Sequence, residues 1–102
     1  MNMAGKHALI TGASRGIGAV IAQELVDRGA RCTLVARNSE TLHRTAAEVG
    51  AQALPADLSD PTDYCDLIAR AEDLQGPLEI LVNNAARTSM QDFWELSGEE
   101  LR

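Results

Sequence analysis

The sequence predicts an α/β fold in which a parallel sheet is covered by helices on both faces, a three-layer α/β/α arrangement. Short apolar runs alternate with segments whose apolar residues recur at helical spacing. The runs are continuously apolar rather than alternating, which is typical of strands buried on both faces. Glycines at positions 29, 50 and 76 fall where each helix gives way to the next strand. The 102 residues are enough for one modest domain.

The order of the elements follows from these runs. Strands are expected at residues 8–11, 32–36, 51–56 and 78–82, and helices at 17–28, 39–49 and 61–74. Asp60 suits the N-cap of the third helix and Pro61 its first position. The residues of this helix expected to face the core are Tyr64, Leu67, Ile68 and Ala71. Right-handed crossovers between parallel strands make the arrangement half of a Rossmann-like fold.

Composition excludes several classes of function. Fifteen acidic residues against nine basic ones, a net charge of −6, do not suit a general nucleic-acid binder or a binder of anionic membranes. No apolar run approaches the roughly 18 residues of a membrane span, and no signal peptide pattern opens the chain, so we expect a cytoplasmic location. Cys32 and Cys65 are expected to be buried, reduced thiols, and the histidines are not spaced as metal ligands, so no metal site is expected.

The first expected strand and helix are joined by a glycine-rich loop with the spacing G-x-x-x-G-x-G. Gly12 allows a tight turn, Gly16 lets the backbone approach a pyrophosphate, and Gly18 lets the helix pack closely on the sheet. The free N–H groups at the start of that helix then face an anion. No Gly-Lys-Ser/Thr follows, so this is not a P-loop. The alternative, a tight turn without a ligand, is disfavoured by the residues that end the other strands.

Those strand-end residues predict the kind of ligand. Sites selective for NAD carry an acidic residue after the second strand, where this chain has Arg37. Arg37, with Arg15 of the loop, can bind a 2′-phosphate through paired hydrogen bonds, which favours NADP over NAD. Asp57 follows the third strand, and Asn83 and Asn84 follow the fourth, at the edge where open α/β sheets bind ligands. Each also has a plainer interpretation, as a loop carboxylate or as amides that satisfy backbone groups.

Together these motifs resemble the short-chain dehydrogenase/reductase family, in order and spacing, over essentially the whole chain. The resemblance implies the strand order 3-2-1-4, an adenine contact at Asp57 and Leu58, and a ribose border at 83–86. The chain departs from the family at Ala86, where a glycine is usual. The cofactor-binding residues implied are Gly12, Ser14, Arg15, Gly16, Ile17, Gly18, Arg37, Asp57, Leu58, Asn83, Asn84 and Ala85.

The same resemblance implies hydride transfer between a nicotinamide and a carbonyl or alcohol, with a tyrosine and a lysine four residues later as acid–base pair. Tyr64 is the only tyrosine, Ile68 stands four residues on, and Lys6 is the only lysine, so no catalytic residue is expected in this chain. Residues 1–102 are therefore expected to be the N-terminal NAD(P)-binding Rossmann portion of a single domain without its C-terminal catalytic part. A capping box at 97–100, which announces a helix close to Arg102, fits that expectation.

Three functions stay open on the sequence. The chain is the cofactor-binding part of an NADP(H)-dependent oxidoreductase, a non-catalytic NADP-binding sensor, or a strand-pairing interaction module. The expected partners are a dinucleotide, further copies of the chain in a homo-oligomer and, only in a longer form, a small carbonyl or alcohol substrate. Neither nucleic acid nor membrane is expected. Residues 78–82 would form an exposed apolar sheet edge that favours self-association.

Overall fold

A computed structural model describes residues 3–12, 16–37 and 39–84, and it contains the expected alternation of strands and helices. The elements are β1 (His7–Thr11), α1 (Ile17–Asp27), β2 (Arg31–Ala36), α2 (Glu40–Val49), β3 (Gln52–Pro55), α3 (Pro61–Tyr64), α4 (Leu67–Gln75) and β4 (Ile80–Val82). The helix expected from the capping box near the C-terminus lies outside the described residues.

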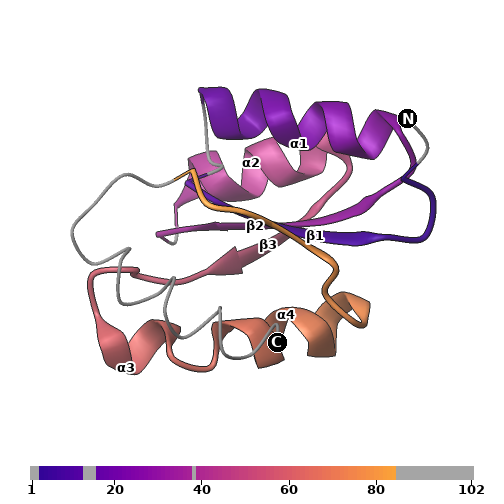
Figure 1. The fold of residues 1–102 in the computed structure, drawn as a ribbon. Coiled ribbons are helices and arrows are strands. Elements are labelled where there is room, and N and C mark those ends of the chain that lie inside the picture. The colour runs from indigo at the N-terminus through magenta and orange to yellow at the C-terminus, as the bar shows by residue number, and fades with distance from the viewer. Residues whose placement is uncertain (1–2, 13–15, 38, 85–102) are drawn as a thin grey trace.

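The strands form one parallel sheet in the order β3-β2-β1-β4. Helices α1 and α2 cover one face, and α3 and α4 cover the other (Figure 1). The predicted three-layer architecture and strand order are therefore confirmed. Because all strands run the same way, their carboxyl ends, and the residues that follow them, meet at a single edge of the sheet.

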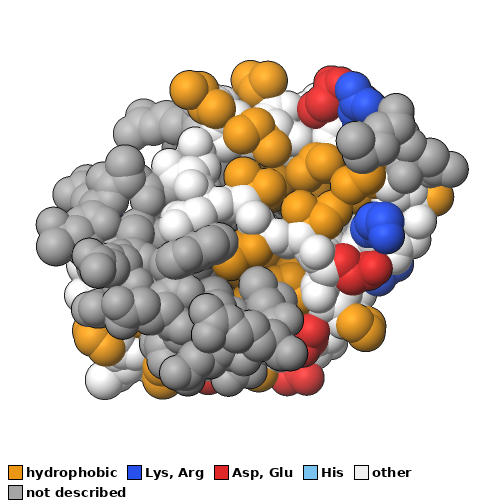
Figure 2. All heavy atoms as spheres, in the orientation of Figure 1, with side chains coloured by type: hydrophobic (Ala, Val, Ile, Leu, Met, Phe, Trp, Pro, Cys, Tyr) orange, Lys and Arg blue, Asp and Glu red, His pale blue; other side chains and the backbone are white. Residues whose placement is uncertain are grey.

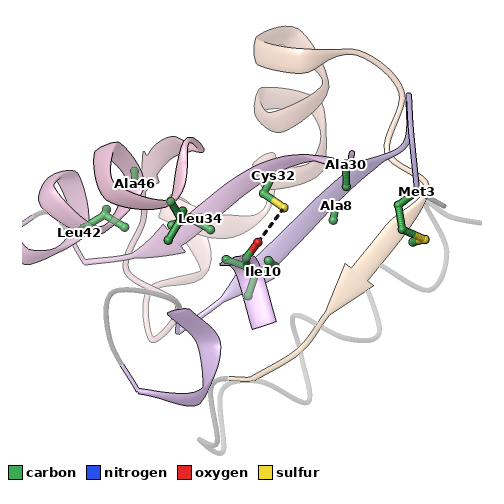
Figure 3. Packing of buried hydrophobic residues seen from close by; sticks show 10 residues of the cluster. Met3, Ala8, Ile10, Ala30, Cys32, Leu34, Leu42 and Ala46 are labelled. Atoms are coloured by element: carbon green, nitrogen blue, oxygen red, sulfur yellow. Dashed lines mark hydrogen bonds between the residues drawn. The ribbon is translucent and has the colours of Figure 1, made fainter. Parts of the chain in front are cut away.

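Alternate residues of the central strands build a core on each face. Ala8 and Ile10 of β1, with Leu34 of β2, pack under α1 and α2 (Figure 3). Leu9 and Val35 lie on the opposite face, under α3 and α4. Each of these five side chains is completely buried, which explains why both strands read as unbroken apolar runs in the sequence.

Side chains cap the starts of two helices, at Asp60 as predicted and at Ser39, which the sequence placed inside the second helix. The hydroxyl of Ser39 caps α2 by accepting the backbone N–H of Leu42 at 3.1 Å. The carboxylate of Asp60 caps α3 by accepting the N–H of Thr62 at 3.0 Å, and Pro61 occupies the first position. Gly50 ends α2 in the left-handed conformation.

Three details correct the expectations. The segment expected to form the third helix forms two helices, because α3 ends at Tyr64 and α4 begins at Leu67. Between them, the backbone of Asp66 has φ −107° and ψ 16° and is not helical. The expected edge strand is shorter: β4 begins only at Ile80, and the N–H of Leu78 donates to Oε2 of Glu72 at 2.7 Å rather than to a strand. Cys32 is a buried free thiol as expected, whereas Cys65 is a free thiol on the surface at the break between the two helices.

Candidate dinucleotide site

The glycine-rich loop leaves β1 through a sharp turn. Gly12 has φ 64° and donates its N–H to the carbonyl of Val35 at 2.8 Å, so the chain still follows β2 where it begins to turn. Gly16, at φ 69°, occupies the N-cap of α1. Both conformations disfavour residues with a side chain, which supports the roles that the spacing assigns to these two glycines. Ser14 and Arg15 lie outside the described residues.

Among the described residues, no side chain binds the N-terminus of α1. Gly16 has no side chain to cap the helix, and the first turn holds no acidic residue. Helices α2 and α3, in contrast, are capped by Ser39 and Asp60. Within the described part of the chain, the first N–H groups of α1 therefore lack an intrahelical or side-chain acceptor, and the helix dipole adds partial positive charge there. Such a terminus favours an anion such as a pyrophosphate.

The end of β4 is fastened to the start of the loop by hydrogen bonds that we call the Thr11–Asn84 clasp. The backbone N–H of Asn84 donates to Oγ1 of Thr11 at 3.0 Å, and the side-chain amide of Asn84 donates to the carbonyl of Gly12 at 3.1 Å. The Thr11 hydroxyl makes longer contacts with Val82 O at 3.5 Å and with Oδ1 of Asn83 at 3.4 Å. Asn84 therefore satisfies backbone groups, the plainer role considered for it, and by doing so holds the two motifs together.

Asp57 follows β3 and is held in a fixed conformation. Its Oδ1 accepts the backbone N–H of Ser59 at 2.9 Å and the Ser59 hydroxyl at 2.6 Å. These bonds lower the pKa of the Asp57 carboxyl from its ordinary value, the side-chain bond most, and the positive charge of Arg37 adds a smaller effect of the same sign. The carboxyl is therefore ionised near neutral pH and acts as a hydrogen-bond acceptor.

Two groups in the Asp57 loop are left without partners among the described residues. They are Oδ2 of Asp57, an acceptor, and the backbone N–H of Leu58, a donor. The Leu58 side chain packs on the core below the sheet, which anchors its backbone. The Watson–Crick edge of adenine presents the complementary pair, an amino donor and a ring-nitrogen acceptor, so these two groups suit an adenine ring.

The predicted residues that the structure describes lie together at one edge of the sheet. Sheet order places Asp57 after β3, Arg37 after β2, Gly12 after β1 and Asn84 after β4. Arg37 is exposed, and these two strand ends are near neighbours, because the N–H of Ala56, just before Asp57, donates to the carbonyl of Ala36 at 2.9 Å. Ala85, predicted beside them, lies outside the described residues. Within the described ranges no group of three His, Cys, Asp or Glu side chains is placed to hold a metal ion.

Two residue types that catalysis would require lie away from this edge. The side chain of Tyr64 is buried against the sheet under α3 and α4, as its helical spacing predicts. Lys6 precedes β1, at the opposite end of the strands, and pairs with Glu79 at 3.5 Å. The edge therefore offers contacts for a nucleotide but no tyrosine–lysine pair.

Sequence reasoning missed the residues that support the Asp57 loop. Oδ2 of Asp63 accepts the backbone N–H of Asp57 at 2.5 Å, and Arg70 bonds the backbone carbonyls of Asp63 and Pro55. Their sequence signal is weak, because an aspartate and an arginine on the same helical segment are usually a solvated ion pair. Thr11 ends the first expected strand, but its hydrogen bonds to the end of β4 depend on the sheet order, which spacing along the chain does not show.

Comparison with known proteins agrees with this geometry. The short chain dehydrogenase family matches residues 6–102. A 3-oxoacyl-[acyl-carrier-protein] reductase of rhamnolipid biosynthesis from Pseudomonas aeruginosa is 46% identical over 88 residues, covering 82% of this chain and 34% of that protein. A sorbitol dehydrogenase from Cereibacter sphaeroides is 40% identical over 101 residues, covering 97% of this chain and 40% of that protein.

Solved structures agree as well. The RhlG/NADP active-site complex from Pseudomonas aeruginosa superposes with a TM-score of 0.77 at 39% identity, covering 93% of this chain and 40% of that one. A metagenomic short-chain oxidoreductase in complex with NADP gives a TM-score of 0.76 at 37% identity, covering 83% of this chain and 41% of that one. The fold, with its strand ends meeting at one edge, defines an α/β protein of the Rossmann type. More particularly, the chain belongs to the short-chain dehydrogenase family, and it spans 34–41% of the length of these relatives.

Proposed function

We propose that the chain is the NADP(H)-binding part of an oxidoreductase that transfers hydride between the nicotinamide and a carbonyl or alcohol. The proposal rests mainly on one observation: three features lie at the same edge of the sheet. They are the uncapped N-terminus of α1, the arginine after β2 and the acceptor–donor pair after β3. Each suits one part of the dinucleotide. NADP in two of the related structures supports the choice of cofactor.

Each part of the cofactor has an assigned contact in this proposal. The N–H groups at Gly16, Ile17 and Gly18 bind the pyrophosphate, as anions bind at helix N-termini. Arg37, with Ser14 and Arg15 of the loop, binds the 2′-phosphate, because a guanidinium matches phosphate oxygens with paired donors. Residues 83–85 border the ribose next to the nicotinamide, the ring that supplies or accepts the hydride.

The adenine lies, in this proposal, against Asp57 and Leu58. Adenine donates from its amino group to Oδ2 of Asp57 and accepts from the N–H of Leu58. In the orientation assigned to adenine, guanine and hypoxanthine present the opposite pair, a carbonyl oxygen and a ring N–H, and leave both protein groups unsatisfied. The loop therefore selects adenine over these bases.

The proposal assigns binding and orientation to this chain, but not proton transfer. Among its 102 residues the only tyrosine packs in the core and the only lysine lies at the other end of the sheet. We therefore expect the purified chain to bind NADPH without consuming it in the presence of carbonyl compounds. Oxidation of NADPH that Tyr64→Phe abolishes would contradict this assignment.

Arg37→Asp tests the cofactor choice. Two charge-assisted hydrogen bonds to a phosphate are worth about 2–4 kcal/mol, so we expect NADPH affinity to fall by about 30-fold or more and NADH affinity to stay within about threefold. Isothermal titration of the chain with each cofactor measures both. Arg44→Asp is the matched control, because it reverses a charge on the exposed surface of α2, where Arg44 faces Glu40 at 4.0 Å. An equal loss of NADPH and NADH affinity in Arg37→Asp would remove the phosphate role.

Self-association belongs to the same proposal. Within the described residues β4 pairs only with β1, and Ile80, Leu81 and Val82 are all partly exposed. On α1, Ile17 is 71% exposed and Val20 is 70% exposed. Figure 2 shows hydrophobic side chains gathered on the face where β4 and α1 lie in Figure 1. Open edges of this kind recruit other strands, so we expect a homo-oligomer, with sedimentation that depends on protein concentration.

A cytoplasmic location is the last part of the proposal. It is supported by two cysteines that are both free thiols, as is usual in reducing compartments. None of the helices in the described ranges is long and apolar enough to cross a membrane. Cell fractionation tests the location directly.

A further inference from the structure

The Asp57 loop is held by an acidic side chain that does not belong to it. Oδ2 of Asp63, on α3, accepts the backbone N–H of Asp57 at 2.5 Å, a short bond to a charged acceptor. The carbonyl of Asp57 accepts the N–H of Asp60 at 3.0 Å. Both backbone groups of Asp57 are thus bound, which fixes the direction in which the next peptide, with the N–H of Leu58, leaves the turn.

Asp63 is in turn held by Arg70 on α4. One guanidinium nitrogen of Arg70 donates to the backbone carbonyl of Asp63 at 3.0 Å and lies 3.8 Å from its carboxylate. Another donates to the carbonyl of Pro55, the last residue of β3, at 3.2 Å. Arg70 therefore links α4, α3 and the end of β3, and these links enclose the Asp57 loop. Its side chain is 35% exposed, less than a free surface arginine would be.

We propose that Asp63 and Arg70 are positioning residues for the base of the nucleotide: Arg70 fixes α3 against the end of β3, and Asp63 fixes the peptide of Asp57. Neither touches the adenine. They set the spacing between the acceptor of Asp57 and the donor of Leu58, and with it the preference for adenine. This inference rests on the proposed binding of a dinucleotide at this edge.

Asp66 provides a matched control within the same cluster. Its carboxylate also lies near Arg70, at 3.7 Å, and it is 62% exposed. It makes no capping hydrogen bond to α4 and no contact with Asp57. Asp66→Ala therefore removes the same charge from the same arginine, but it leaves the acceptor of the Asp57 N–H in place.

The test uses the 102-residue chain with two readouts. The first is amide hydrogen exchange of the segment around Asp57, without ligand. The second is the ratio of the affinities for NADP⁺ and for its hypoxanthine analogue. This ratio reports the preference for adenine, and it does not change if the folded fraction of the protein falls. We expect Asp63→Ala to accelerate exchange about tenfold and to reduce the adenine preference about fivefold or more, as for loss of a hydrogen bond to a charged group. Arg70→Met should act in the same direction. Asp63→Asn keeps an oxygen acceptor, so its exchange rate and its adenine preference should lie between those of Asp63→Ala and the wild-type chain.

Asp66→Ala is expected to change either readout by less than about twofold. The inference is overturned if Asp63→Ala leaves exchange and preference unchanged, or if Asp66→Ala matches its effects. If the wild-type chain shows no preference between NADP⁺ and the analogue although it binds both, the adenine assignment fails while dinucleotide binding stands. If it binds neither, the proposed function fails, and this inference fails with it.

Discussion

Removing the hydroxyl of Thr11 is expected to lower both the free energy of unfolding and the affinity for NADP⁺, and a second variant distinguishes the two effects. Thr11→Val replaces the hydroxyl with a methyl of similar size, so it opens no cavity at a fully buried site. It removes the acceptor of the Asn84 N–H, a bond of 3.0 Å, and two contacts of 3.4 and 3.5 Å that are too long to add much. A backbone N–H left unsatisfied and partly buried costs about 1–2 kcal/mol, and that is the expected loss in free energy of unfolding.

Thr33→Val is the comparison. It removes the same atoms from the neighbouring strand, but this hydroxyl bonds Nε2 of His7 at 2.7 Å and accepts from Nε2 of Gln75 at 3.0 Å. Both the hydroxyl and the His7 ring are completely buried, so we expect a larger loss, about 2–3 kcal/mol. Thr33 supports the contact between the sheet and the end of α4, away from the glycine loop.

Urea unfolding at a fixed protein concentration measures both variants, and titration with NADP⁺ measures the site. We expect midpoint shifts of about 1 M for Thr11→Val and more for Thr33→Val. Affinity for NADP⁺ should fall about three- to tenfold in Thr11→Val only, because the clasp holds the loop and the end of β4 together. Equal effects on affinity, or none in Thr11→Val, would refute the link between clasp and cofactor.

Other residues give further predictions. Burial raises the pKa of Cys32 to about 11, so at pH 8 only about one molecule in a thousand carries the Cys32 thiolate. Iodoacetamide should therefore label exposed Cys65 in the native chain and Cys32 only in urea, and mass spectrometry measures both. His7→Phe leaves the carbonyl of Gly76, bonded at 2.9 Å, without its partner and removes one of the two partners of the buried Thr33 hydroxyl. It should cost about 1–3 kcal/mol in urea unfolding, and a change below about 1 kcal/mol would contradict the bonding shown. Because the pKa of Asp57 is lowered, its carboxylate persists as pH falls; NADP⁺ preference over the hypoxanthine analogue should hold from pH 7 to 5 and decline only in stronger acid, below the ordinary carboxyl range.

Most of the fold could be predicted because local and tertiary signals agree. Strands buried on both faces read as unbroken apolar runs, and the cap at Asp60, followed by Pro61, marks a helix start through its own chemistry. The break between α3 and α4 could not be predicted in the same way. Tyr64 and Leu67, on either side of it, keep helical spacing toward the core, so the apolar pattern runs through the break.

The candidate site was predictable where a motif determines the local backbone, as at Gly12 and Gly16. The exposure of Cys65 was not predictable, because a thiol gives no sequence signal of the side on which it lies. The roles of Asp63 and Arg70 depend on how α4 packs beside the end of β3, a tertiary relation that spacing does not encode. Supporting residues of this kind become visible only when the elements are placed in space.

The Thr11–Asn84 clasp also orders events during synthesis. Its partners are 73 residues apart in the chain, the longest separation among the hydrogen bonds described above. At about 5–20 residues per second a ribosome needs roughly 4–15 s to produce the second partner after the first. During that interval β1 can pair with β2 but not with β4, and the glycine loop emerges without the strand end that will hold it. The binding edge is therefore completed late in folding, and a nucleotide that binds there stabilises only chains whose sheet has closed.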